Sequence, residues 1–245
     1  GLGKRDRISA EKIRQAGGKA ATYLRSVGIK KAALSADFLS ALKISPAEFV
    51  EGALLGLYTY NRYKKDEDKK SLESLTLLAK ASGELTQGLK RAEAVTEAVC
   101  FARDLVNTPA NDMSPTEIAK AASSLRNKKL SVRVLDRKDA RKLGMGAFLS
   151  VAKGSKEEPK FIVLDYKGAV GAPVVLIGKA ITFDSGGISL KPSEGMEKMK
   201  YDMAGGAAVL GVMKAVSALQ LPVHIVGILP ATENLPGGSA TKPGD

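Results

Sequence analysis

Residues 107–245 alternate between segments with the pattern of a β-strand and segments with the pattern of an α-helix, and this alternation constrains the fold most. Helices are predicted at residues 115–126, 138–143 and 203–219, and strands at residues 130–136, 159–168, 172–183 and 223–231. Strands that alternate with helices predict an α/β fold, in which helices flank a sheet. Ligands of such sheets gather at the carboxyl ends of strands, where we expect the turn from Lys179 to Asp184.

The first part of the chain carries a shorter version of the same pattern. Helices are predicted at residues 9–27 and 45–60, and strands at residues 29–36 and 71–78. A long amphipathic helix is predicted over residues 87–107 and ends before Thr108 and Pro109. We therefore expect a small α/β unit in residues 1–83, a connecting helix in residues 84–108 and a second domain in residues 109–245.

The bulk composition is that of a soluble globular protein. Of 245 residues, 44% are hydrophobic and 26% are charged, and the apolar runs are shorter than the roughly 20 residues that span a bilayer. We expect no membrane partner. A single cysteine, Cys100, excludes an internal disulfide and is typical of a cytoplasmic protein, and its helical context predicts a buried, unreactive thiol. The chain starts at Gly1 without an initiator methionine, so we expect it to begin inside a longer polypeptide.

The formal net charge of +12 permits a nucleic-acid partner. However, the basic residues are spread along the chain, and aromatic residues make up only 5% of it. The one dense run, residues 63–70, mixes both signs of charge. A solvated basic surface is therefore the favoured interpretation, and DNA binding stays an alternative.

The single histidine, His224, narrows the chemistry by exclusion. Catalysis by Ser-His-Asp or Cys-His groups would need His224 itself, and a zinc site with several histidines is excluded. Because His224 lies in an apolar run typical of a buried strand, we expect a core histidine with satisfied hydrogen bonds. Any metal chemistry then depends on carboxylates and lysines.

Residues 174–202 concentrate such groups in an otherwise apolar, glycine-punctuated segment. They include Lys179, Asp184, Lys191 and Asp202. Taken one by one, these residues have plain structural interpretations: Lys179 and Asp184 could form a partly buried ion pair, and Asp202 could be the N-cap of the helix that follows.

Taken together, the four charges favour a functional interpretation. Burying them is costly unless ions or each other compensate them, and a divalent cation would do so. Carboxylate oxygens are hard ligands, and a lysine amine can bind a metal when it has lost its proton. A second lysine that keeps its charge can stabilise an oxyanion.

At this point a resemblance to a known family becomes specific. Residues 177–211, IGKAITFDSGGISLKPSEGMEKMKYDMAGGAAVLG, resemble the metal-binding core of the leucyl aminopeptidase (cytosol aminopeptidase) family, with further matches at residues 103–119 and 223–245. Residues 1–21 are similar to a segment late in the family's macro-like N-terminal domain. The resemblance implies an α/β protein with part of that N-terminal domain, a connecting helix, and the first part of a mixed-sheet, di-metal aminopeptidase domain.

The resemblance also implies a role for each matching residue. Lys179 corresponds to a ligand of one of two divalent ions, Asp184 to the carboxylate that both ions share, and Asp202 to a further ligand of the lysine-bound ion. Lys191 corresponds to the catalytic lysine that polarises the scissile carbonyl, and Met199 to a residue that lines the pocket for the first side chain of the substrate.

The reaction implied is the removal of N-terminal amino acids, with a leucine-type preference, from peptides by a water that two metal ions activate. Members of the family use manganese, zinc, magnesium or cobalt and assemble as homo-hexamers. Their NTDAEGR segment, which follows the PGD found here at residues 243–245, supplies two more acidic ligands and the arginine that holds a bicarbonate.

We therefore expect half a site in this chain, and little peptidase activity from the chain alone. The alternatives are a DNA-binding regulatory role, suggested by the net charge, and a truncated, catalytically dead paralogue that serves in assembly.

Overall fold

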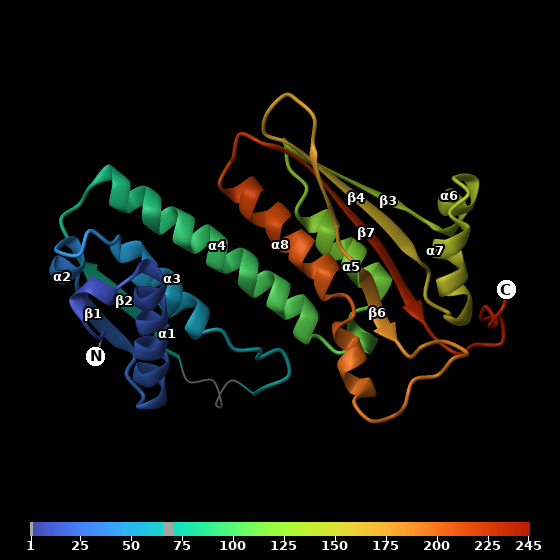
Figure 1. Cartoon of the computed structure of the whole chain (residues 1–245), viewed down its shortest axis with the longest axis horizontal. Helices are drawn as coiled ribbons and strands as arrows, with labels where there is room; N and C mark the ends of the chain where they lie inside the picture. The colour runs from blue at the N-terminus through green and yellow to red at the C-terminus, as the bar shows by residue number, and fades with distance from the viewer. Residues whose placement is uncertain (1, 66–70) are drawn as a thin grey trace. The chain divides into compact units, whose positions relative to one another are not determined.

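The computed structural model describes residues 2–65 and 71–245 (Figure 1). The chain forms two compact units, Gly1–Cys100 and Phe101–Asp245, which divide within helix α4 (Gly83–Asn107). The finer domain boundaries, after residues 83 and 108, stay predictions. Residues 66–70 of the mixed-charge run lie outside the described residues.

The first unit contains the predicted helices and strands with small shifts at their ends. Its elements are the 3₁₀ helix η1 (Arg5–Arg7), α1 (Ala10–Ser26), β1 (Lys31–Ser35), α2 (Asp37–Ser40), α3 (Pro46–Gly56) and β2 (Ser74–Leu78). Ser9 caps α1 by accepting a hydrogen bond from the backbone of Lys12, as its sequence pattern indicates. Strands β1 and β2 pair in parallel. The short helix α2 was not predicted.

Helices α1 and α3 pack closely because glycines face each other between them. A Cβ atom on Gly52 would lie 1.9 Å from the carbonyl oxygen of Arg14, so no larger residue fits there. Beside this contact, Nε of Arg14 on α1 donates to Glu51 on α3 at 2.9 Å, and Glu48 pairs with the same guanidinium. The first unit is therefore held by a close backbone approach and an ion-pair cluster.

The second unit is built on a mixed five-stranded sheet, as the resemblance implies. Its strands are β3 (Leu130–Leu135), β4 (Lys160–Lys167), β5 (Val174–Ile177), β6 (Ala180–Asp184) and β7 (His224–Asn234). The order is β3-β4-β7-β5, and β6 also pairs with β7. Strand β4 runs antiparallel to both β3 and β7. Strands β5 and β6 run parallel to β7.

Two sequence predictions about this sheet were wrong in detail. The single strand expected at residues 172–183 is split into β5 and β6 at Gly178 and Lys179, because the start of α8 (Ala204–Ala218) approaches there. A Cβ atom on Gly178 would lie 2.4 Å from the carbonyl oxygen of Gly205. Consequently the expected turn from Lys179 to Asp184 is mostly strand: Lys179 follows the carboxyl end of β5, and Asp184 ends β6. Strand β7 also continues past its predicted end to Asn234.

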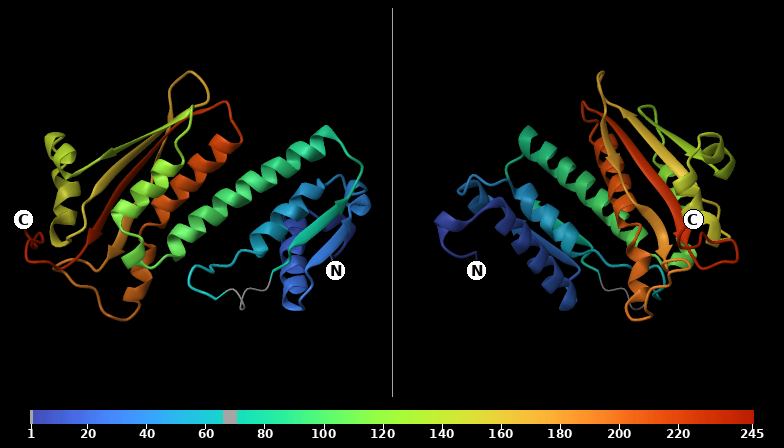
Figure 2. Two further views of the ribbon diagram at one scale, coloured as in Figure 1. Left: turned by 180° about the vertical axis from the view of Figure 1, so that it is seen from behind. Right: turned by 45° about the vertical axis from the view of Figure 1, so that its right-hand side comes forward.

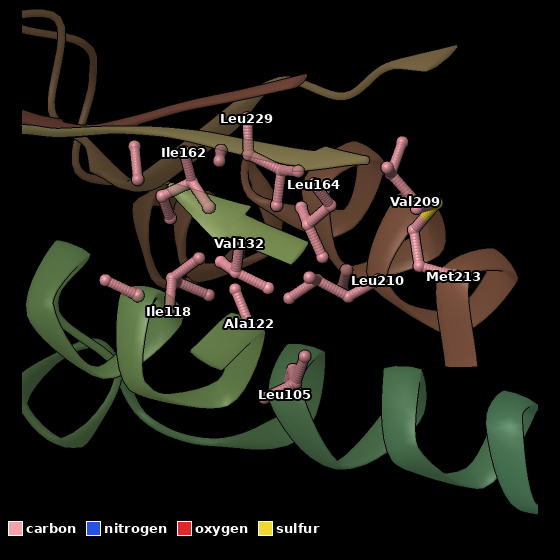
Figure 3. Packing of buried hydrophobic residues seen from close by; sticks show 14 of the residues in the cluster. Leu105, Ile118, Ala122, Val132, Ile162, Leu164, Val209, Leu210, Met213 and Leu229 are labelled. Atoms are coloured by element: carbon pink, nitrogen blue, oxygen red, sulfur yellow. The ribbon is translucent and has the colours of Figure 1, made fainter. Parts of the chain in front are cut away.

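Helices α5 (Pro115–Ser124) and α8 cover one face of the sheet (Figure 2). The main core lies between these helices and the inward residues of β3, β4 and β7, with Leu105 of α4 at its margin (Figure 3). Buried side chains include Ile118, Ile162, Leu164, Leu210 and Leu229, each fully or almost fully buried.

The remaining elements of the second unit are short. They are η3 (Ala110–Asp112), α6 (Arg137–Lys142), α7 (Gly146–Val151), η4 (Ala152–Gly154) and η5 (Met196–Tyr201). A capping box of Asp136 and Asp139 starts α6. Helix α6 contacts β3, and α7 contacts β7.

Candidate functional site

The four charged residues singled out in the sequence meet at one place. Lys179 lies in the link between β5 and β6, Asp184 ends β6, Lys191 follows in the next loop, and Asp202 lies between η5 and α8. Nζ of Lys179 is 2.7 Å from Oδ2 of Asp202 and 3.9 Å from Oδ2 of Asp184. Nζ of Lys191 is 3.0 Å from the same Asp184 oxygen. The charges therefore alternate in sign around a small cluster.

Asp184 is the centre of this cluster and is the most buried of its four side chains, with 13% of its surface exposed. Its Oδ1 accepts hydrogen bonds from the backbone of Gly186 at 2.9 Å and from the amide of Asn234 at 2.7 Å. Burial acts to raise the pKa of Asp184, but the hydrogen bonds from Lys191, Gly186 and Asn234 together lower it below its ordinary value. The carboxylate is therefore held charged at neutral pH.

The loop that follows Asp184 is tied to the end of β7. The backbone and the hydroxyl of Ser185 both donate to the carbonyl oxygen of Asn234, at 3.0 and 2.8 Å. Gly186 and Gly187 have φ angles of +92° and +68°, which residues other than glycine rarely adopt. A Cβ atom on Gly187 would also lie 2.6 Å from Oδ1 of Asn234. The two glycines thus allow the loop to turn tightly around Asp184.

Lys191 is anchored at its amine by three groups. Its Nζ donates to the carbonyl oxygen of Asp184 at 3.0 Å and to the sulfur of Met199 at 3.2 Å, besides the contact with the Asp184 carboxylate. Met199 lies on η5. Met199, expected to line a substrate pocket, therefore touches Lys191, expected to polarise the substrate carbonyl. The side chain of Lys191 remains 37% exposed and is open to a ligand.

Asp202 is not the helix cap that its position suggested, because Met203 occupies the N-cap position of α8. Its Oδ2 is buried, and no donor among the described residues reaches it with hydrogen-bond geometry, although Lys179 is 2.7 Å away. The Lys179 ammonium therefore compensates the charge of this buried carboxylate.

The donor set fits part of a divalent-metal site. Asp184 and Asp202 offer hard carboxylate oxygens, and Lys179 between them offers an amine. Over residues 2–65 and 71–245, no three His, Cys, Asp or Glu side chains come together as a metal site would need. What the cluster offers is two carboxylates and one amine.

Asn234 belongs to this cluster although it was not predicted as a site residue. It is 50 positions from Asp184 in the sequence and reaches it because β6 and β7 pair in parallel with Asp184 opposite Asn234. The only local signal was its place shortly after an apolar strand. The sequence prediction missed Asn234 because it ended the strand at residue 231.

The chain's histidine and cysteine lie outside the cluster. Nδ1 of His224 lies 2.7 Å from the carbonyl oxygen of Gly171, and Nε2 lies 2.9 Å from Oδ1 of Asp165. His224 therefore has satisfied hydrogen bonds as predicted, but it lies at the margin of the sheet, not in the core. Cys100, predicted to be buried, is partly exposed on α4.

A hollow of about 250 Å³ lies beside the loop that contains Gly186 and Gly187, here called the glycine loop. It is lined by residues 186–189, by Asn234, and by residues 240–243 near the end of the chain. It adjoins the cluster through the loop, so a ligand held in it would lie next to the backbone that positions Asp184.

A second hollow, of about 590 Å³, is lined by the cationic residues Arg126, Lys128, Lys129 and Lys214. It lies where α5 and α8 end. One of these cations, Arg126, donates to the carbonyl oxygen of Val132 at 2.8 Å. Across the described parts of the chain, every helix is too short or too polar to cross a bilayer.

Comparison with known proteins connects this geometry to one group. The model of the catalytic domain of the cytosol aminopeptidase family matches residues 100–245, and the model of its N-terminal domain matches residues 1–67. The probable cytosol aminopeptidase of Geotalea uraniireducens is 47% identical over 257 residues, which cover 100% of this chain and 51% of that protein. The protein of the same name from Azoarcus sp. is 51% identical over 78% of this chain and 40% of its own length.

Two solved structures are similar over nearly the whole chain. The bottromycin maturation enzyme BotP in complex with Mn has a TM-score of 0.84 and 33% identity, and covers 98% of this chain and 51% of its own. A mutant tomato leucine aminopeptidase has a TM-score of 0.83 and 33% identity, over 96% of this chain and 47% of its own. The chain thus spans about half the length of the relatives it matches.

Proposed function

Because this chain belongs to the cytosol aminopeptidase family, we propose that it forms the first half of a metal-dependent aminopeptidase. The enzyme removes N-terminal residues, with a leucine-type preference, from peptides. The observation that carries the proposal is the cluster in which Lys179, Asp184 and Asp202 lie together with Lys191 beside them. The two relatives, both probable cytosol aminopeptidases, agree with this activity.

Lys179, Asp184 and Asp202 would hold the divalent ions in this proposal. The closeness of the two carboxylates to the Lys179 amine supports it, and the relative that was solved with Mn favours manganese, with zinc, magnesium and cobalt as the alternatives. When bound, such ions act as Lewis acids that polarise a carbonyl and activate water. The protein's task is to keep the ligands fixed, which Gly186 and Asn234 do through their bonds to Asp184.

Lys191 is the proposed catalytic residue. Its amine is held by the backbone carbonyl and the carboxylate of Asp184, so its position depends on the metal ligand beside it. A positive group fixed in this way stabilises the negative charge that develops on the carbonyl oxygen during hydrolysis. The proposed pocket wall, Met199, touches the same amine and so places the substrate's first side chain near the reacting bond.

The chain alone is proposed to be inactive or nearly so. Half a ligand set binds ions weakly, and the acidic residues and bicarbonate-binding arginine of the family's second half would have to come from elsewhere. The cytosolic location, the peptide substrates and the hexameric assembly also stay proposals.

A chimera tests the proposal directly. This chain replaces the matching half of the Geotalea uraniireducens protein, and hydrolysis of leucine p-nitroanilide is measured with Mn²⁺. We expect activity from the chimera and a fall of at least about 100-fold with Lys191→Ala, since one oxyanion-stabilising group contributes that much. Lys198→Ala, on the exposed part of η5, is the matched control and should keep the activity.

Two results would count against the proposal. One is a folded, Mn²⁺-loaded chimera that does not cleave the substrate, and the other is a Lys191→Ala chimera as active as the Lys198→Ala control. Rates typical of the relatives from the 245-residue chain alone would refute the expectation that the second half is required.

A further inference from the structure

The hollow of about 590 Å³ in the second unit gathers cations from two separate parts of the chain. Arg126, Lys128 and Lys129 come from the link between α5 and β3, and Lys214 comes from α8. Among the described residues that line it, none is an aspartate or a glutamate. We call this feature, with its four cations, the basic hollow.

The basic hollow lies far from the proposed metal ligands. The carbonyl oxygen of Lys129 accepts from the backbone of Lys167, at the end of β4 that pairs with His224. His224 is the first residue of β7, whereas Asp184 pairs with Asn234, the last. At about 3.3 Å for each residue, β7 separates its two ends by roughly 30 Å (Figure 1). A ligand in the basic hollow is therefore not part of the aminopeptidase site.

The cations of the basic hollow are not neutralised by carboxylates nearby in the sequence. Residues 118–135 and 203–232, which contain both walls of the hollow, include no Asp or Glu. Within the parts of the chain that the structure describes, no carboxylate forms an ion pair with Arg126, Lys128 or Lys129. Like charges gathered in one hollow repel each other, so binding of an anion among them is favoured.

Two helix ends oppose an anion at this place, but they are outweighed. Helix α5 ends at Ser124 and α8 at Ala218, and the C-terminus of a helix carries roughly half a negative charge. The side-chain amide of Gln220 donates to the carbonyl oxygen of Ser217 at 2.6 Å, which satisfies one acceptor at the end of α8. The four full positive charges exceed two half charges, so the net charge of the basic hollow favours an anion.

The loop that carries Lys128 and Lys129 is held in place by Asn127. Its Oδ1 accepts a hydrogen bond from the backbone of Lys129 at 3.0 Å. Its amide donates to the hydroxyl of Ser217 on α8 at 2.7 Å, a contact across 90 positions of the sequence. This contact joins the two walls of the basic hollow. Because the loop is already ordered, a ligand does not have to order it, which lowers the cost of binding.

The lining of the basic hollow matches the chemistry of phosphate groups. Lysine amines bind phosphate as compact charges, and an arginine guanidinium can bind two oxygens of one phosphate. The volume of the hollow is within the range of small-molecule sites. None of the described lining residues is aromatic, so the hollow offers no ring on which a nucleic-acid base could stack.

We propose that the basic hollow binds a small compound that carries two or more linked phosphate groups. Several cations in one small volume match several phosphates on one molecule better than a single phosphate. In this arrangement Lys128 and Lys129 bind the phosphates from one wall and Lys214 binds them from the other. The site involves none of the proposed metal ligands, so it is independent of the aminopeptidase function.

Inorganic tripolyphosphate is the probe, because it has linked phosphates and neither a base nor a sugar. Isothermal titration calorimetry measures its binding to the 245-residue chain at about 0.15 M ionic strength, where diffuse attraction between exposed charges is largely screened. We expect one site on each chain. Tripolyphosphate should bind at least about ten-fold more tightly than orthophosphate, because it makes more charge-assisted hydrogen bonds.

Charge-removing variants test whether binding occurs in the basic hollow. The double variant Lys128→Gln and Lys129→Gln should weaken tripolyphosphate binding at least about ten-fold. The matched control, Lys142→Gln with Lys153→Gln, removes two charges from exposed lysines outside the hollow and should change the affinity less than about two-fold. Lys214→Met keeps the apolar stem, removes the amine and should also weaken binding. Thermal melts establish that each variant is folded.

Three results with the probe would overturn the proposal: no binding of tripolyphosphate, equal affinities in the two double variants, or orthophosphate binding as tight as that of tripolyphosphate. A short duplex DNA that binds more tightly than tripolyphosphate through Lys128 and Lys129 would also overturn it, since the hollow would then be part of a nucleic-acid surface. These measurements read binding and not peptide hydrolysis, so this proposal and the proposed function can fail separately.

Discussion

The two ends of strand β7 hold two polar clusters that differ in how completely they are satisfied. At the start, both ring nitrogens of His224 have acceptors, and Asp165 also pairs with Lys167 at 3.4 Å. At the end, Asn234 supports Asp184, whereas a buried oxygen of Asp202 has the Lys179 ammonium 2.7 Å away but no hydrogen bond from the described residues. The first cluster is satisfied by its hydrogen bonds, whereas the second depends on charge contacts among two lysines and two carboxylates.

The largest expected difference between the clusters is in activity. In the chimera with the Geotalea uraniireducens half, Asp184→Asn should lower kcat/KM by more than about 100-fold, because it removes the charge of a proposed metal ligand. Asp165→Asn, the matching change at the other end of the sheet, should alter kcat/KM less than about three-fold. Steady-state kinetics with saturating Mn²⁺ measures both, and equal losses would remove the functional distinction.

The glycine loop should show a smaller effect, on stability. Gly187→Ala meets both a φ of +68° and the Asn234 amide at 2.6 Å, and should lower the free energy of unfolding by at least about 2 kcal/mol. Gly195→Ala has a similar φ of +75° but no atom within 4 Å, and should cost only about 1 kcal/mol. Urea denaturation of the two variants separates the contact from the backbone strain, and a smaller loss for Gly187→Ala would contradict the tight fit.

The smallest effect concerns pH at the start of β7. The carbonyl of Gly171, together with Asp165, raises the pKa of His224 above its ordinary value, despite the opposing influence of Lys167. A raised pKa means that the folded state binds the proton more tightly than the unfolded state. The resulting stabilisation is full below the ordinary pKa of about 6.5 and is lost as pH rises through the higher folded value.

Because the chain has one histidine, the Hε1 proton of its ring gives a single NMR signal that reports this pKa. We expect a midpoint above 6.5, a downward shift in Asp165→Asn, and no shift in Asp184→Asn. A midpoint below 6.5 would mean that the two hydrogen bonds do not hold the charged ring.

Much of the fold could be predicted from local pattern. The cap at Ser9, the apolar strand of β4 and the small-residue helix α8 were all predicted near their true places, since each depends on neighbours within a few positions. Strand ends were less accurate. The break at Gly178 and the extension of β7 to Asn234 depend on contacts with distant segments, such as Gly205 at the start of α8.

The sequence by itself determined which groups could do chemistry here. Lys179, Asp184, Lys191 and Asp202 stand out because charged residues in an apolar segment need compensation wherever the segment folds. Only the tertiary structure decided that Asn234 joins Asp184 and that Ile177 on β5 is 71% exposed. These outcomes follow from the register of strands distant in sequence, which is set by total burial and hydrogen bonding over the sheet and leaves no local pattern to read.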